Sequence, residues 1–311
     1  MASTSPHREL QAQLETLTTE AFRPELADID QLPTLDLARL MNSEDTTVPA
    51  AVAARLPEIA AAIDAVAERM ARGGRLVYAG AGTAGRLGVL DASECPPTFN
   101  TDPEQVRGLI AGGPGAMVTS VEGAEDSAEL ARADLDALAL TATDTVVGIS
   151  ASGRTPYAIG AVRHARARGA LTIGLACNAD SALVAAAEHG IEIVVGPELL
   201  TGSTRLKAGT AQKLVLNMLS TITMIRLGKT YGNLMVDVRA SNEKLRARSR
   251  RIVALATGAG DEEIERALAA TDGEVKNAIL TILAGVDGPT ADRLLEESGG
   301  HLRAALAAAG G

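Results

Sequence analysis

The chain has few aromatic residues, few cysteines and no long apolar run. Aromatic side chains make up 2% of its 311 residues and tryptophan is absent, so the core must be aliphatic. Two cysteines and four histidines lie scattered without metal-ligand spacing, so we expect no disulfide framework, no metal and a cytoplasmic location. No apolar run reaches about 18 residues, and residues 1–13 hold no apolar segment, so we expect neither a membrane span nor a signal peptide.

The charge balance argues against a nucleic-acid partner. Formal net charge is −10, whereas nucleic-acid-binding domains are usually basic. The densest basic run, KLRARSRR (244–251), is interpreted as a solvated helix face. An anionic small substrate stays compatible with this balance, because a few local donors outweigh distant charges at short range.

Strand and helix patterns alternate through the middle of the chain. Because parallel strands joined by helices need both faces covered, this order predicts an α/β fold, a three-layer α/β/α sandwich with a parallel sheet. The expected strands are Arg75–Gly80, Val106–Gly112, Asp144–Ser150, Leu171–Asn178 and Ile191–Gly196. The expected helices are 50–72 (started or kinked by Pro57), one from Ala84, 120–138, one ending near Arg168, and 207–227.

The composition and the helix and strand patterns change near both ends of the chain, which suggests three parts. Residues 1–48 are acidic, with short helices and no strand signal, and predict an N-terminal helical arm. Residues 49–255 form the sandwich domain, and residues 256–311 show three short helical patterns separated by glycine, which predict a small three-helix domain. The apolar stripe of that domain (Val275, Ile279, Ile282, Leu283) is interpreted as its own core, and a partner surface is the alternative.

A glycine loop follows the first expected strand. Gly80, Gly82 and Gly85 have the G-x-G-x-x-G spacing of dinucleotide sites, but the second strand does not end in the acidic residue that would hold a ribose, since Glu104 precedes that strand. We therefore interpret the loop as a tight turn whose backbone N–H groups meet a smaller anion, and we expect no cofactor.

A serine loop, SASGRT, follows the third expected strand and opens a helix. Ser150, Ser152 and Thr155 surround Gly153 and could cradle a phosphate together with helix-start N–H groups. The alternative is a purely structural role, in which these side chains form an ordinary helix cap. The nearby glycine loop makes a ligand site the better interpretation.

A third loop, TGSTRLKAGTAQK (201–213), precedes the long helix. It supplies Ser203, Thr204, Arg205 and Lys207, which could meet an anionic group of a substrate. A capped helix with solvated basic residues explains the pattern equally well.

Two acidic motifs suggest proton transfer. Glu94 precedes Pro96 and Pro97, which predict that the helix stops and places Glu94 at a sharp turn. Glu122 and Glu125 lie in VEGAEDS. The structural alternative is that these acidic residues stabilise the start of a helix through its dipole. A carboxylate in a partly dry pocket could exchange protons near neutral pH.

Five strings in order resemble the N-acetylmuramic acid 6-phosphate etherase family, over about residues 35–311. They are GAGTAGRLGVLDASECPPTF, VEGAEDS, SASGRTPY, TGSTRLKAGTAQKLVLNMLST and GNLMVDVRASNEKL. The resemblance implies a sugar isomerase (SIS) fold, a small C-terminal helical domain, and a homodimer with sites near its interface. No match is found for residues 1–34.

The resemblance also implies a lyase that cleaves the lactyl ether of a muramic acid phosphate in cell-wall sugar recycling. It assigns Glu94 to the elimination and Glu125 to a second catalytic role, such as hydration. The same resemblance and the loops place the sugar phosphate on Gly82, Thr83, Ser150, Ser152, Gly153 and Thr155, with Ser203 and Lys207 in addition. Arg205 or Lys207 is the expected partner of the lactyl carboxylate.

Rival functions share the fold. A sugar-phosphate-binding regulator such as the glucokinase regulatory protein is the main alternative, and the presence of both glutamates favours an enzyme. An aldose–ketose isomerase comes next. A DNA-binding regulator has no basic recognition helix in residues 1–48, and an NAD-dependent dehydrogenase comes last.

Overall fold

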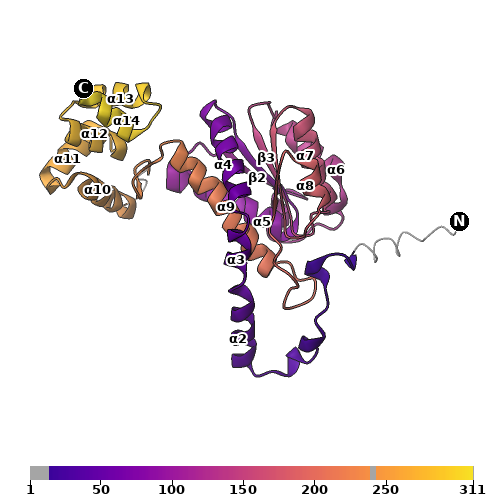
Figure 1. Cartoon of the computed structure of the whole chain (residues 1–311). Coiled ribbons are helices and arrows are strands. Elements are labelled where there is room, and N and C mark those ends of the chain that lie inside the picture. Colours follow the sequence, from indigo (N-terminus) through magenta and orange to yellow (C-terminus); the bar gives the residue numbers. More distant parts are fainter. Residues whose placement is uncertain (1–13, 239–242, 311) are drawn as a thin grey trace. The chain divides into compact units, whose positions relative to one another are not determined.

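The computed structural model describes residues 14–238 and 243–310, which fall into two compact units (Figure 1). The first unit holds the described residues up to Ala92 together with Val106–Leu219. The second holds Ser93–Gln105 and the described residues from Ser220 onward. The prediction about a signal peptide in residues 1–13 lies outside the described residues.

A parallel five-stranded sheet forms the centre of the first unit, as predicted. Its order is β2-β1-β3-β4-β5, so the direction in which the chain moves across the sheet reverses between β1 and β3. In doubly wound sheets, this reversal leaves a crevice at the carboxyl ends of the two strands. The strands are β1 (Leu76–Gly80), β2 (Val106–Ile110), β3 (Thr145–Ser150), β4 (Leu171–Ala176) and β5 (His189–Glu192).

Helices cover both faces of this sheet, which confirms the three-layer prediction (Figure 1). Strand residues alternate between the faces: Val77 and Val146 pack with Tyr157 of α7, whereas Tyr78 donates a hydrogen bond to Asp91 of α5 at 2.8 Å. The helices of the first unit and those that continue from it are α2 (Thr34–Asp45), α3 (Val48–Ala53), α4 (Leu56–Ala71), α5 (Gly82–Phe99), α6 (Ala128–Ala137), α7 (Pro156–Ala167), α8 (Ala182–Ala186) and α9 (Lys207–Arg226).

Most element predictions are confirmed with shifted ends. Pro57 lies in the first turn of α4, so it starts a helix and does not kink one. The acidic segment 120–138 is not a single helix, since it contains the short 3-10 turn η5 (Ala124–Asp126) before α6. The last strand, β5, begins and ends earlier than the predicted 191–196.

The helix stop at Glu94 was wrong. Helix α5 continues through Pro96 and Pro97 to Phe99. Each proline removes one N–H donor, but both lie in the last turn, and the N–H of Asn100 closes that turn on the carbonyl of Pro96 at 3.0 Å. The left-handed backbone of Asn100 (φ 51°) then ends the helix.

The described part of the N-terminal arm contains helices and no strand, as expected. It begins with three 3-10 turns, η1 (Thr18–Glu20), η2 (Pro24–Leu26) and η3 (Ile29–Gln31), followed by α2. Leu17 and Thr19 are buried, so the start of the arm packs on the first unit.

The second unit has its own aliphatic core. Its elements from Thr230 onward are the hairpin β6 (Thr230–Tyr231) and β7 (Leu234–Met235), then α10 (Glu243–Thr257), α11 (Asp261–Ala270), α12 (Val275–Ala284), α13 (Gly288–Glu297) and α14 (Leu302–Ala309). Val275 and Ile279 lie in that core, whereas Leu283 is exposed.

The C-terminal pattern differs from expectation in two respects. The third predicted helix is two helices, α13 and α14, because Gly299 and Gly300 adopt positive φ between them. Helix α10 packs on α11 and α12, although the predicted boundary at 255/256 separates them. The three-part division of the chain stays a prediction. Within the described residues, no helix has the length and apolarity to cross a membrane.

Candidate functional site

A cavity of about 580 Å³ opens at the carboxyl edge of the sheet, where β1 and β3 end. It brings the glycine loop and the serine loop together, as the sequence predicts. A stretch of the N-terminal arm closes one side. The lining residues are Leu14, Leu17, Glu20, Ala81, Gly82, Thr83, Ala84, Glu125, Asp126, Ser150, Ala151, Ser152, Arg154, Thr155, Pro156, Thr204 and Gln212.

The glycine loop is the turn from β1 into α5. Strand β1 ends at Gly80, and α5 begins at Gly82, so the first N–H groups of the helix lie at the cavity wall. A Cβ at Gly85 would lie 2.6 Å from the carbonyl oxygen of Gly80, so the turn tolerates no side chain there. The expected N–H cradle is therefore formed by a close strand-to-helix approach.

The serine loop gathers three hydroxyl groups. Ser150 Oγ lies 3.2 Å from Ser152 Oγ and 2.8 Å from Thr155 Oγ1. The N–H of Gly153 donates to Ser150 Oγ at 3.0 Å, which fixes the loop around a buried serine. The more accessible hydroxyls of Ser152 and Thr155 keep capacity for hydrogen bonds to a ligand.

The alternative that this loop is an ordinary helix cap does not fit Thr155. Thr155 stands at the N-cap position of α7, yet its side chain makes no cap hydrogen bond. Its hydroxyl lies against Ser150 instead. The first N–H groups of α7 therefore add to the donors near the cavity. Gly153 does not line the cavity. It supports the loop as a glycine, because its φ is 68° and a Cβ there would lie 2.3 Å from Ser181 Cβ.

Glu125 lies at the junction of two hollows. It lines the main cavity and also a neighbouring one of about 330 Å³, and Ala81 and Gly82 line both. The side chain is exposed and projects from η5, after the left-handed Gly123. Its carboxylate therefore has access to the cavity and to solvent water at once.

Glu94 is an exposed residue of α5 and belongs to the second unit. It is not among the residues that line the cavity of the first unit. Its assigned role stays a prediction.

The third loop contributes to the cavity only one of the residues that the sequence analysis named, Thr204. Lys207 is buried, and its Nζ donates to Glu44 Oε2 at 2.7 Å, so its charge is neutralised within the protein. Ser203 and Arg205 do not line the cavity, whereas Thr204 and Gln212 do. Glu44 lies 163 positions before Lys207, and no local pattern connects the two.

A buried carboxylate that the sequence analysis missed holds the start of α9. Glu198 accepts the N–H groups of Lys207 and Ala208, each at 2.9 Å. Burial raises the pKa of Glu198, and these N–H groups and the charge of Lys207 oppose that rise. Its position at a helix start gives it a structural role.

Comparisons with known proteins show the family of the chain. The family model for the SIS domain matches residues 124–222, and that for the glucokinase regulatory protein N-terminal SIS domain matches residues 58–166. An N-acetylmuramic acid 6-phosphate etherase of Streptomyces avermitilis is 88% identical over 309 residues, which are 99% of each chain. Another, of Mycolicibacterium smegmatis, is 55% identical and spans 95% of this chain and 99% of its own.

This chain belongs to the N-acetylmuramic acid 6-phosphate etherase family. The match to the Streptomyces etherase extends into residues 1–34, where the sequence analysis found none. A phosphoheptose isomerase of Neisseria gonorrhoeae superposes with a TM-score of 0.49 at 15% identity, over 61% of this chain and 98% of its own.

The etherase strings account for most of the cavity wall. Four of the five strings supply every lining residue outside the segment 14–20. The fifth, GNLMVDVRASNEKL, starts at Gly232 in the second unit, and its residues 239–242 lie outside the described part. The sequence analysis missed Arg154, although it stands inside SASGRT, and it missed Leu14, Leu17 and Glu20, which no motif marks.

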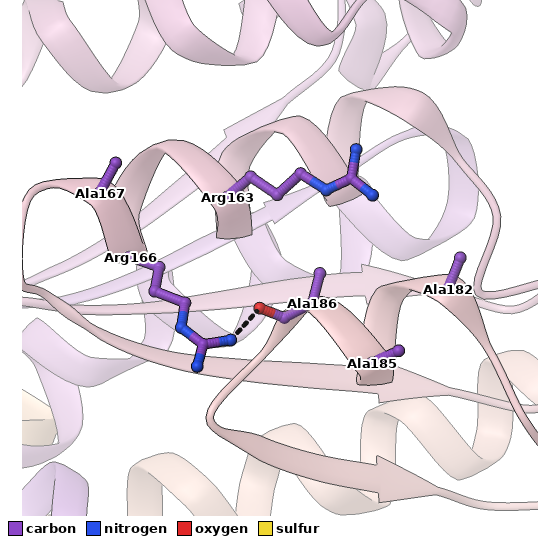
Figure 2. Close-up of a pocket in the computed structure, with 6 residues that line it drawn as sticks. All are labelled: Arg163, Arg166, Ala167, Ala182, Ala185 and Ala186. Atoms are coloured by element: carbon purple, nitrogen blue, oxygen red, sulfur yellow. Dashed lines mark hydrogen bonds between the residues drawn. The ribbon is translucent and has the colours of Figure 1, made fainter.

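A second hollow of similar volume lies between α7 and α8 (Figure 2). Arg163, Arg166 and four alanines line it. The guanidinium of Arg166 donates to the carbonyl oxygen of Ala186 at 3.1 Å. Because this lining contains neither a hydroxyl nor a carboxylate, it offers no acid or base, and the carboxyl-edge cavity is the better site. No cluster of histidine, cysteine or carboxylate side chains among residues 14–238 and 243–310 could hold a metal ion.

Proposed function

We propose that this chain cleaves the D-lactyl ether of N-acetylmuramic acid 6-phosphate to give N-acetylglucosamine 6-phosphate and D-lactate. The observation that carries the proposal is the 88% identity with an etherase over nearly the whole chain. The cavity at the ends of β1 and β3 offers a place for a phosphorylated sugar.

In this proposal, the 6-phosphate lies against the serine loop and the starts of α5 and α7. Ser152 and Thr155 offer hydroxyl donors, and Thr83 adds one more on the facing wall. The two helix N-termini favour negative charge, each by about 0.3–1 kcal/mol at exposed positions, so several donors must act together.

The chemistry follows from the open-chain aldehyde form of the sugar. The C2 proton is acidic because it lies α to the aldehyde, and the ether oxygen on C3 lies β to it. A base removes the C2 proton while an acid protonates the departing lactate oxygen, which leaves a C2–C3 double bond. Water then adds its hydroxyl group at C3 and a proton at C2, which gives the product sugar.

Two carboxylates supply these proton transfers. We assign Glu94 to the elimination and Glu125 to the hydration step, where its exposure to solvent gives it access to water. These steps need neither a metal nor a nucleotide, so we propose no cofactor.

Location and assembly belong to the same proposal. Cys95 and Cys177 are buried and not joined in a disulfide, which suits the reducing cytoplasm. Helix α2 buries none of its side chains in one copy, and Leu35 is 59% exposed, which supports association of two copies as a homodimer. Sedimentation of the pure chain measures this state directly.

The function is tested by incubating the pure chain with N-acetylmuramic acid 6-phosphate and measuring D-lactate with time. We expect stoichiometric lactate and N-acetylglucosamine 6-phosphate. Tight binding of the sugar phosphate without lactate would favour a regulator, and ketose phosphates without ether cleavage would favour an isomerase. Either result would contradict the proposal.

A further inference from the structure

One side of the cavity combines a single cation with apolar side chains. Arg154 is the only lysine or arginine among the described residues that line the cavity. Its Nη2 donates to Thr16 Oγ1 of the N-terminal arm at 3.1 Å, so the guanidinium extends from the serine loop toward the arm. Leu14 and Leu17 of the same arm line the cavity there, and Glu20 adds a carboxylate.

Asn178, which follows β4, holds this wall in place. Its Oδ1 accepts from Thr18 Oγ1 at 2.9 Å and from the N–H of Thr19 at 3.4 Å, and its Nδ2 donates to Thr19 Oγ1 at 3.0 Å. Nδ2 also donates to the carbonyl of Ala151 in the serine loop at 2.9 Å. The side chain thereby uses its full hydrogen-bonding capacity to join the arm to the loop that carries Arg154.

We propose that Arg154, Leu14 and Leu17 form the subsite for the lactyl group of the substrate. This inference rests on the proposed function. A lactyl ether carries a carboxylate and a methyl group on one carbon, which matches a guanidinium beside leucine side chains. A guanidinium binds carboxylates through two parallel hydrogen bonds, and the leucines cover the methyl group.

The two cations that the sequence analysis offered for the lactyl carboxylate are otherwise placed. Lys207 is buried and paired with Glu44, and Arg205 does not line the cavity. Glu20, Glu125 and Asp126 are acidic lining residues, so the lactyl carboxylate is repelled from their positions and Arg154 is its charge partner. The phosphate has hydroxyl and helix-start donors of its own, so Arg154 is left for the second anion.

The test compares two ligands that differ in the lactyl group. Wild-type and Arg154→Gln chains are titrated calorimetrically with N-acetylglucosamine 6-phosphate, and their KM for the ether substrate is measured by lactate release. We expect Arg154→Gln to raise KM about ten- to a hundredfold, the usual effect of losing a hydrogen bond to a charged group. Its affinity for the sugar phosphate should stay within about twofold, which also shows that the variant is folded.

Equal losses for both ligands would overturn the proposal, because Arg154 would then bind the phosphate. No loss for either would overturn it as well. Arg166→Gln is the matched control, since Arg166 is another exposed arginine that donates to a neighbouring oxygen of the same unit (Figure 2). Leu14→Ala should raise KM for the ether about two- to fivefold and leave sugar-phosphate affinity unchanged.

Failure of this subsite is distinguishable from failure of the proposed function. If the wild-type chain released no lactate, the proposed function would fail. Titration with the intact ether would then still compare wild type with Arg154→Gln. An unchanged dissociation constant in that titration would overturn the subsite on its own.

Discussion

The two ends of strands β1 and β3 differ in how far their polar groups are hydrogen-bonded within the protein. At the amino end, Asp144 is 1% exposed, and its carboxylate is fully engaged. It accepts from the guanidinium of Arg75 at 2.7 and 3.1 Å, from the backbone N–H of Arg75 at 2.8 Å and from the N–H of Thr141 at 2.8 Å. Both oxygens of this carboxylate are therefore hydrogen-bonded within the protein.

At the carboxyl end, the polar groups keep unused capacity. The hydroxyls of Ser152 and Thr155 and the first N–H groups of α5 and α7 face a cavity, and Glu125 is exposed beside them. The same two strands thus carry a hydrogen-bonded ion pair at one end, which stabilises the fold, and hydroxyl and N–H donors with unused capacity at the other, where we propose that the sugar phosphate binds. Changes at the two ends should therefore separate stability from function.

The largest effect is expected at the carboxylates. Glu125→Gln and Glu94→Gln should each lower kcat by about 10²–10⁴, the range for a lost general acid or base. Both side chains are exposed, so the free energy of unfolding should change by less than about 0.5 kcal/mol. Lactate assays and denaturation measure the two quantities. Glu129→Gln, an exposed glutamate outside the cavity, is the control, and a full rate in either catalytic variant would refute its assignment.

The opposite result is expected at the amino end. Asp144→Asn should lower the free energy of unfolding by about 3 kcal/mol, near the lower limit for a broken buried ion pair, because 23% of the Arg75 side chain is exposed. Affinity for the sugar phosphate should not change. Asp136→Asn is the control. Its pairs with His164 and Arg168 lie at the surface, so this change should lower the free energy of unfolding far less.

The same pair predicts a pH dependence. Burial alone would raise the pKa of Asp144, but Arg75 and the backbone N–H groups hold that pKa below its ordinary value. A carboxyl with a lowered folded-state pKa stabilises the fold above about pH 4 and loses that contribution as the pH falls through its folded pKa. The stability difference between wild type and Asp144→Asn should therefore shrink below about pH 4, and a constant difference would contradict the ion-pair account.

A smaller effect is expected in the serine loop. Ser152→Ala should weaken sugar-phosphate binding by about 0.5–3 kcal/mol, because one or two hydrogen bonds to a charged group are lost. Calorimetry measures this loss. Ser43→Ala changes an exposed serine of α2 and should have no effect on affinity. Equal affinity in the two variants would remove Ser152 from the phosphate site.

Sequence patterns predicted the elements whose determinants are local. β-branched runs and the turns after Gly80 and Ser150 located β1, β3 and both cavity loops, because strand preference and turn chemistry depend largely on neighbouring residues. Pro57 likewise located the start of α4. The same local rule failed at Pro96, because the helix ends at Phe99 and only its last turn has to accommodate the missing N–H donors.

Contacts between distant segments could not be predicted in this way. Lys207 looks like a free cation in its loop, and only the fold brings Glu44 to it. Leu17 is buried, and its segment has no motif, so only its packing places it at the cavity. Residue types indicated the chemistry of the site, whereas the partners of each charge depended on tertiary structure.

The most direct test of the central claim is a crystal structure of the chain with N-acetylglucosamine 6-phosphate. We predict the phosphate within hydrogen-bonding distance of the Ser152 and Thr155 hydroxyls and the first N–H groups of α5 or α7. A phosphate bound elsewhere, such as between Arg163 and Arg166 in the hollow of Figure 2, would contradict it.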